Sequence, residues 1–187
     1  DGSLNWDRGV GDPAFVLAAA PGPAAASLDD LAFAYVEGLH SGDCYYTREG
    51  RAVYRHALAG DEVSLDARAP VSVASATGYI RCGYGGARRQ LEWTLPLLLA
   101  ARDLRAIDNA GTEFCEIARN AAHFMVEARG LSDGYNLLAW PIVRAAGACV
   151  SLIRHDFLRH LRTVMPSPTP WHRAIPGLGG ATILGDG

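Results

Sequence analysis

The chain has 187 residues, of which 49% are hydrophobic and 20% charged, so it is long enough to bury a core, and we expect a single domain over residues 1–187. Its formal net charge of −3 excludes a broadly basic surface for nucleic acid, although arginines can still gather on one face. No apolar run reaches the roughly 18 residues of a membrane span, and no signal peptide is recognisable.

The chain begins Asp1-Gly2-Ser3 without methionine, which indicates that an upstream segment has been removed or left out. All 17 of its cationic side chains are arginines, and there is no lysine. A GC-rich genome explains this bias. It is also what a toxin chain would need in order to avoid ubiquitin attachment in a foreign cytosol, because that modification requires a lysine amine.

The first half of the sequence, about residues 14–86, predicts a β-rich region. Short apolar or alternating runs are separated by turn residues, such as the Pro-Gly-Pro at 21–23 and the Ser-Gly-Asp at 41–43, which joins two strands as a hairpin. The predicted strands lie at residues 15–17, 31–36, 44–47, 53–56, 71–73 and 79–82.

The hydrophobic period changes near Gln90, and about residues 90–165 predict an α-rich region. One helix is expected over 91–107. A second carries the apolar stripe 114–128, with Thr112 as a candidate N-cap. A third is expected over 135–164, interrupted at Pro141. Residues 166–187 form a tail rich in proline and glycine. The fold class predicted is therefore α+β, with a mixed or antiparallel N-terminal sheet and a helical C-terminal half.

The sequence contains no pattern typical of a metal or cofactor site. The four cysteines, at 44, 82, 115 and 149, lack metal-ligand spacing, so we expect buried free thiols, with two disulfides as the alternative. No phosphate-binding loop or dinucleotide fingerprint is present. We therefore expect no cofactor and no metal.

One carboxylate has an unusual position. Glu127 ends the most apolar predicted helix, where burial is costly unless an arginine such as Arg129 is close. An ordinary helix-end carboxylate paired on the surface explains it as well, and Glu116 with Arg119 forms an equally simple pair at helical spacing.

The order of segments resembles the ribosome-inactivating protein family. The strand pair Leu-Ala-Phe-Ala-Tyr-Val-Glu-Gly at 31–38 and Cys-Tyr-Tyr at 44–46 is similar to a tyrosine-bearing strand pair of that family. The Gly-Tyr-Gly-Gly turn at 83–86, the helix ending Met-Val-Glu-Ala-Arg at 125–129 and the tryptophan segment at 135–140 follow in the family's order.

This resemblance implies an rRNA N-glycosidase, a hydrolase and toxin that removes an adenine from ribosomal RNA and so inhibits translation. Tyr35 and Tyr84 would stack on the adenine, and Trp140 would close its pocket. Glu127 would stabilise the ribose cation or orient water, and Arg129 would stabilise the departing base. The register Glu116–Arg119 is the alternative for this catalytic pair.

The resemblance also implies the ribosome as partner, a possible second toxin chain or other subunit, and secretion followed by action in a target-cell cytosol. Two other classes of function stay open at this point: a non-enzymatic structural or interaction protein such as a viral coat fragment, and a different enzyme such as another toxin transferase. Convergence of Tyr35, Tyr84, Glu127 and Trp140 on one cleft would favour the N-glycosidase.

Overall fold

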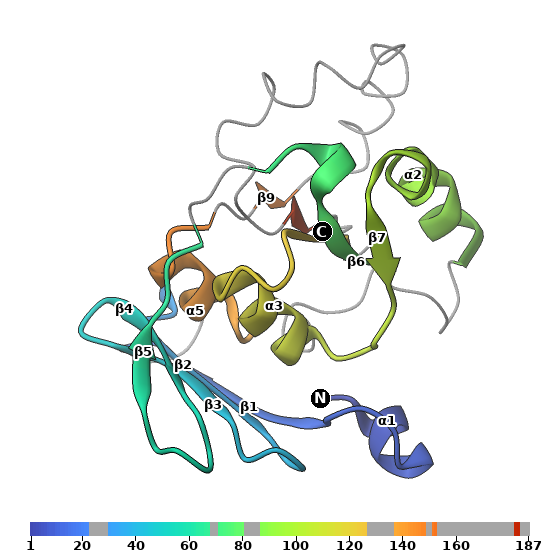
Figure 1. The fold of residues 1–187 in the computed structure, drawn as a ribbon. Helices are drawn as coiled ribbons and strands as arrows, with labels where there is room; N and C mark the ends of the chain where they lie inside the picture. The colour runs from blue at the N-terminus through green and yellow to red at the C-terminus, as the bar shows by residue number, and fades with distance from the viewer. Residues whose placement is uncertain are drawn as a thin grey trace.

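The computed structural model of the chain describes residues 1–22, 30–67, 71–80, 87–126, 137–148, 151–152 and 182–183. For residues 87–93 it describes the backbone alone. These residues form an antiparallel sheet in the N-terminal part and helices later in the chain, which confirms the α+β prediction (Figure 1). None of the described helices is long and apolar enough to cross a bilayer.

The N-terminal sheet has five antiparallel strands in chain order. A short turn joins β2 to β3, as the sequence predicted for the hairpin at 41–43, and another joins β3 to β4. The strands are β1 (Ala14–Ala19), β2 (Phe33–Gly38), β3 (Cys44–Arg48), β4 (Arg51–Arg55) and β5 (Glu62–Ser64). The last of them was not predicted, because its three residues are all exposed and carry no alternation.

Burial alternates along β2, so one face of this sheet points into the protein and the other points outward. The inward face carries small and aromatic residues, including Ala34, Val36 and Tyr45, which belong to the main core. Two helices, α3 (Ala110–Ala118) and α5 (Trp140–Ala145), cover this inward face.

A second sheet of three parallel strands lies on the other side of α3 (Figure 1). The central strand β6 (Thr77–Ile80) pairs with β7 (Asp103–Arg105) and with β8 (Phe124–Val126). Parallel neighbours need long connections. Helix α2 (Ala87–Ala100) lies in the connection from β6 to β7, and α3 lies between β7 and β8.

The second sheet separates two hydrophobic clusters. On β8, Met125 packs in the main core with α3, whereas Phe124 and Val126 pack in a smaller cluster with Leu97 of α2. Because successive strand residues point to opposite faces, α2 and α3 cover opposite faces of this sheet. The described elements therefore form four layers, in the order α2, parallel sheet, α3 with α5, and antiparallel sheet.

Short elements complete the described structure. Helix α1 (Ser3–Arg8) precedes β1, a 3-10 turn η2 (Val73–Ser75) precedes β6, and β9 (Ser151–Leu152) pairs in parallel with β10 (Thr182–Ile183). The strand predicted at 71–73 is therefore wrong, since part of that segment forms η2.

The helical reading of the second half is wrong in three places. The helix predicted at 91–107 ends at Ala100 and is followed by β7. The stripe predicted at 114–128 combines α3 with β8, because a short apolar run buried on both faces has no period that separates strand from helix. Pro141 does not interrupt a helix but lies in the first turn of α5, where its missing N–H is harmless.

Candidate functional site

The structure places two of the residues suggested by the ribosome-inactivating resemblance on opposite faces of the antiparallel sheet. Tyr35 lies on the outward face of β2, where its hydroxyl donates to Glu37 at 2.7 Å. Trp140 begins α5 and is buried in the core beneath the inward face. These two rings therefore cannot line one adenine pocket.

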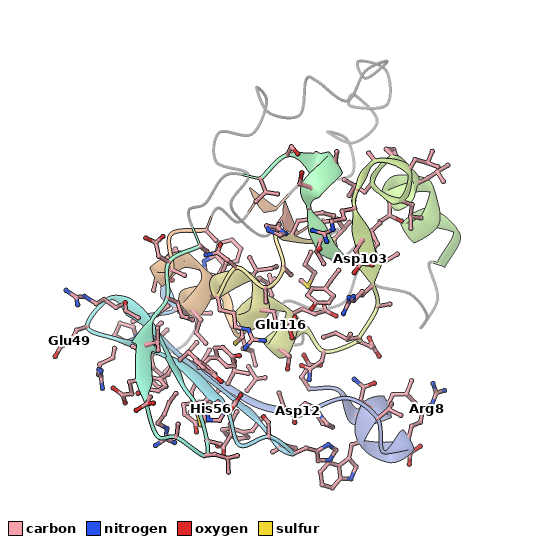
Figure 2. The ribbon with its side chains drawn as sticks, in the orientation of Figure 1. Arg8, Asp12, Glu49, His56, Asp103 and Glu116 are labelled. Carbon is pink, nitrogen blue, oxygen red and sulfur yellow. The ribbon has the colours of Figure 1, made fainter. Side chains whose placement is uncertain are left out.

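The other three residues of that site, Tyr84, Glu127 and Arg129, lie outside the described residues. In the alternative pair, Glu116 of α3 accepts a hydrogen bond from the Tyr79 hydroxyl of β6, beneath the parallel sheet (Figure 2). Arg119 caps the C-terminal end of α3, and its guanidinium lies 5.9 Å from the centre of the Tyr54 ring. The two side chains thus contact tyrosines of different sheets.

A different group of polar residues meets where the start of the chain reaches the N-terminus of α3. The Asp1 carboxylate accepts hydrogen bonds from the backbone N–H of Gly2 at 2.8 Å and from that of Gly111 at 2.9 Å. The terminal amino group donates to the carbonyl oxygen of Ala14 at 2.6 Å. Partial burial lowers the pKa of this amino group. We call Asp1, Gly2, Asn109 and Gly111 the α3 corner.

Asn109 organises the α3 corner from the helix side. Its side-chain oxygen accepts from the Thr112 N–H at 3.2 Å, so Asn109 and not Thr112 is the N-cap. Its side-chain nitrogen donates to the backbone carbonyl oxygen of Asp12 at 2.8 Å. The residue is 1% exposed, and these bonds supply partners that a buried amide requires.

Gly2 is the residue that lets the chain approach Asn109 closely. Its φ of +77° lies in the left-handed region, which costs little only for glycine. A Cβ at this position would lie 3.2 Å from the Asn109 side-chain nitrogen and 3.3 Å from the Pro13 backbone. A larger residue would therefore push the Asp1 carboxylate away from α3.

The electrostatics of the α3 corner favour a negative group. The first N–H groups of a helix lack helical partners and carry the positive end of its dipole. The Asp1 carboxylate occupies that position and is itself on the exposed surface. The Gly111 and Thr112 N–H groups thus have partners within the chain, Asp1 and Asn109, and the positive end of the helix dipole adds to the field at this corner.

A second carboxylate, that of Asp12, lies on the segment between α1 and β1 (Figure 2). Asp12 accepts from the His40 N–H at 2.8 Å and from the Ser41 hydroxyl at 2.5 Å. It therefore ties this segment to the β2–β3 turn. Within the described part of the chain, no three His, Cys, Asp or Glu side chains gather in a way that could hold a metal ion.

No known family model matches this sequence, and no curated protein is similar to it. Solved structures, in contrast, match its fold. SuhB of Mycobacterium tuberculosis matches with a TM-score of 0.68 and 21% identity, covering 81% of this chain and 59% of SuhB. The fold is that of the inositol monophosphatases. An IMPase of Thermotoga maritima matches with a TM-score of 0.61, 17% identity, and coverage of 79% and 52%.

Inositol monophosphatase II of Staphylococcus aureus agrees with these two, with a TM-score of 0.61 and 13% identity over 80% of this chain and 52% of that one. At such identities the likeness establishes the fold alone. This chain spans between about half and three-fifths of the length of these neighbours.

This finding overturns the resemblance to ribosome-inactivating proteins, and with it the rRNA N-glycosidase and toxin predictions. A viral coat fragment finds no support either. The error has a physical source: Phe124–Val126 forms a strand, so the helix thought to carry Glu127 does not run through this segment. The expected partners, cofactors and localisation are not tested by the fold.

Sequence reasoning missed the α3 corner. Asp1 and Gly111 lie 110 positions apart, and no spacing rule connects them. The sequence pointed to Thr112 as the candidate N-cap, although an asparagine before a helical apolar stripe, here Asn109, is also a recognised N-cap signal. That signal could have located the helix N-terminus, but not the carboxylate that meets it.

Proposed function

We propose that this chain is part of a phosphatase that hydrolyses phosphate monoesters of small hydroxylated molecules, and that the α3 corner lies at its phosphate site. The observation that carries the proposal is the fold match to SuhB over 81% of this chain. Two further neighbours are described as bound to inositol monophosphate and to 2′-AMP, which are both phosphate monoesters.

The α3 corner supports this function independently of the fold likeness, which by itself does not define an activity. Phosphate hydrolysis requires groups that position the phosphate and stabilise its charge. The N-terminus of α3 supplies a positive dipole end, at which the Asp1 carboxylate is held by the Gly111 N–H. Gly2 and Gly111 are buried, and Asn109, Pro13 and Val16 fill the space beside them, so these glycines let the chain pack closely at this corner.

Asp1 supplies the negative group that orients water. Two backbone N–H groups fix its carboxylate, which is exposed at the surface and so accessible to a water molecule. A carboxylate held in this way can accept a hydrogen bond from the attacking water and direct it at the phosphorus atom. A divalent cation often assists such reactions, and in this chain it would need ligands from outside the described residues in addition to Asp1.

The test combines binding with turnover. Inositol monophosphate and 2′-AMP are titrated into the ¹⁵N-labelled chain, and inorganic phosphate release is measured with and without Mg²⁺. We expect the amide signals of Gly111 and Thr112 to shift on titration. Asp1→Asn should reduce phosphate release by about two orders of magnitude, the usual range for a positioned proton acceptor.

Asp7→Asn is the matched control, because Asp7 is an exposed carboxylate on the adjacent helix α1. It should leave both measurements unchanged. If neither ester shifts the Gly111 and Thr112 signals and no phosphate is released, the chain does not have this function. If phosphate is released equally by Asp1→Asn, the site lies elsewhere in the fold.

A further inference from the structure

Helix α1 and the β2–β3 turn expose an aromatic pair beside the α3 corner. The Trp6 indole of α1 and the His40 ring of the turn are stacked, with centroids 5.7 Å apart and an angle of 29° between their planes. Trp6 is nevertheless 60% exposed, although tryptophan is a side chain that proteins bury extensively on average. Because the His40 ring lies against one face of the indole, this exposure indicates that the other face is open.

Hydrogen bonds hold His40 behind the indole. Its backbone N–H donates to the Asp12 carboxylate at 2.8 Å, and its ring Nδ1 lies 3.1 Å from the carbonyl oxygen of Gly11. A carbonyl oxygen only accepts, so this contact assigns a proton to Nδ1. His40 is thus fixed at both its backbone and its ring. A ligand that stacks on Trp6 therefore meets a preformed surface and has little ordering of side chains to offset.

Two connections place this aromatic pair next to the α3 corner. The backbone N–H of Trp6 donates to the carbonyl oxygen of Gly2 at 3.0 Å, so Trp6 lies one helical turn from the corner. Asp12 connects the same two groups, since its carbonyl oxygen accepts from Asn109 and its carboxylate accepts from His40. Figure 1 shows α1 beside the N-terminus of the chain. A ligand held at the corner by one end can therefore reach the indole with its other end.

The surroundings of the indole suit a neutral, flat ring. Val10 and Leu39, the sequence neighbours of Gly11 and His40, are apolar and are 52% and 51% exposed. Indole presents a large π face that stacks on other flat rings, and every nucleobase has such a face. An inositol ring is saturated and carries hydroxyl groups, so it offers no π face. The open side of Trp6 therefore favours a nucleobase over a polyol.

We propose that Trp6 binds the nucleobase of a nucleoside monophosphate whose phosphate lies at the α3 corner. The base stacks on the face of the indole opposite His40. This inference rests on the proposed phosphatase function for the position of the phosphate, and it adds the substrate class: nucleotides in preference to polyol phosphates. Trp6 takes no part in the chemical step, and its contribution is to the affinity for the substrate.

Indole N–H signals measure this binding whether or not the ester is hydrolysed. The chain contains four tryptophans, and the Trp6 signal is the one that disappears in Trp6→Phe. 2′-AMP and inositol monophosphate are titrated separately into the ¹⁵N-labelled chain. We expect 2′-AMP to shift the Trp6 signal through the ring current of the base and to leave the signal of the buried Trp140 in place. Inositol monophosphate should shift neither signal.

Two substitutions separate stacking from bulk. Trp6→Leu keeps an apolar side chain without a π face, so it should weaken 2′-AMP binding about tenfold, the usual effect of losing one base–aromatic stack. Its affinity for inositol monophosphate should stay unchanged. Trp6→Phe should retain most of the 2′-AMP affinity, because it keeps an aromatic ring. In turnover, Trp6→Leu should raise KM for 2′-AMP and leave kcat unchanged, the signature of lost ground-state binding.

Leu99→Ala is the control for these substitutions. Leu99 is 81% exposed on α2, in the layer most distant from α1 and the antiparallel sheet, so this variant should bind both esters as the wild type does. Circular dichroism of each variant establishes that the fold is retained.

Three results would overturn the proposal. If Trp6→Leu weakens the binding of both esters equally, Trp6 supports the fold of α1 and does not recognise the base. If adenosine binds as tightly as 2′-AMP, the indole stacks flat rings without any connection to a phosphate site. If the chain sediments as a dimer that Trp6→Leu converts to a monomer, the exposed indole belongs to a contact between two copies of the chain.

The proposed function and this inference fail in different ways. If neither ester releases phosphate but 2′-AMP still shifts the Trp6 and Gly111 signals, the hydrolytic function is wrong and the base site stands. If phosphate is released and KM for 2′-AMP is the same in the wild type and in Trp6→Leu, the phosphatase stands and the base site is wrong.

Discussion

The two sheets of this protein bury their residues in different ways. The antiparallel sheet pairs each strand with the next one along the chain, and burial alternates along β2 between an inward and an outward face. The parallel sheet joins strands separated by residues 81–102 and 106–123, and all three residues of β8 are buried. Substitutions should therefore be tolerated on one face of the first sheet and on neither face of the second.

The largest expected effect tests whether the two sheets share one core through α3. Phe114 of α3 is fully buried, and α3 contacts β1, β2 and β8. Phe114→Ala should lower the free energy of unfolding by about 3–5 kcal/mol, because the cavity cannot be filled by one layer alone. Urea denaturation should still show one transition. Leu99→Ala, on the exposed side of α2, should change the free energy of unfolding by less than about 0.5 kcal/mol.

Separate transitions for the two halves in the Phe114→Ala protein would contradict a shared core. Tryptophan fluorescence and circular dichroism followed together would reveal them, since coincident curves are the signature of a two-state process.

Alanine substitutions at two glycines, one in each sheet, compare how tightly the two sheets are packed. A Cβ on Gly78 of β6 would collide with the buried Phe124 ring of β8, which packs in one cluster with Ala76, Leu97 and Val126. Gly78→Ala should therefore destabilise the fold by about 1–3 kcal/mol. Adding Phe124→Leu should recover part of this loss, as a double-mutant cycle would show.

The matched position in the antiparallel sheet is Gly38 of β2, where a Cβ would meet the side chains of Asp12 and Ser41. These side chains lie at the surface and can rotate away, so Gly38→Ala should cost less than Gly78→Ala. The reverse order of unfolding midpoints would mean that the parallel sheet is the more adaptable of the two.

A substitution in the α3 corner should have a smaller effect on the free energy of unfolding. Asn109→Ala removes the N-cap of α3 and the bond to the Asp12 carbonyl, and should cost about 1–2 kcal/mol. Asn109→Ser should restore the cap alone and give an intermediate value in the same urea titration. A serine variant as stable as the wild type would show that the Asp12 bond contributes nothing.

The smallest effect is a pH dependence in the antiparallel sheet. Burial by itself would raise the pKa of Asp43, but hydrogen bonds from the Ala57 N–H and the Tyr54 hydroxyl outweigh it and hold this pKa below its ordinary value of 3.8. A carboxyl with a lowered folded-state pKa stabilises the fold above its unfolded pKa, and this contribution disappears as the pH falls through the folded pKa.

Urea midpoints measured from about pH 6 to about pH 2.5 should fall at the acid end, and less so in Asp43→Asn, which has no proton to gain. Glu49→Gln, at an exposed turn position, serves as the control. An acid limb that is unchanged in Asp43→Asn would assign the pH dependence to other carboxylates.

The sequence predicted the antiparallel sheet well because its information is local. The run at 31–36, the turn at 41–43 and the return strand at 44–47 correspond to β2 and β3, joined as predicted. Each strand pairs with the next one along the chain, so alternation and turn residues suffice to place it.

The functional prediction relied on one continuous helix over 114–128, but among the described residues α3 ends at Ala118 and Phe124–Val126 forms β8. Phe124–Val126 is apolar throughout, and three residues cannot show whether their period is that of a strand or a helix. Similarly, Tyr35 and Trp140 fall in the expected order along the chain, yet the antiparallel sheet lies between their side chains. Order in sequence says nothing about which face a side chain occupies once the chain has folded.

The sequence by itself determined the α+β class, the hairpin of β2 and β3, and a helix start within three residues of the true N-cap Asn109, because turn chemistry, alternation and capping act between residues close in the chain. The tertiary structure decided the rest: the parallel pairing of β6 with β7 and β8, the burial of Trp140, and the meeting of Asp1 with Gly111. These contacts join distant residues, and the free energy that selects them comes from packing α3 between two sheets, which no local pattern encodes.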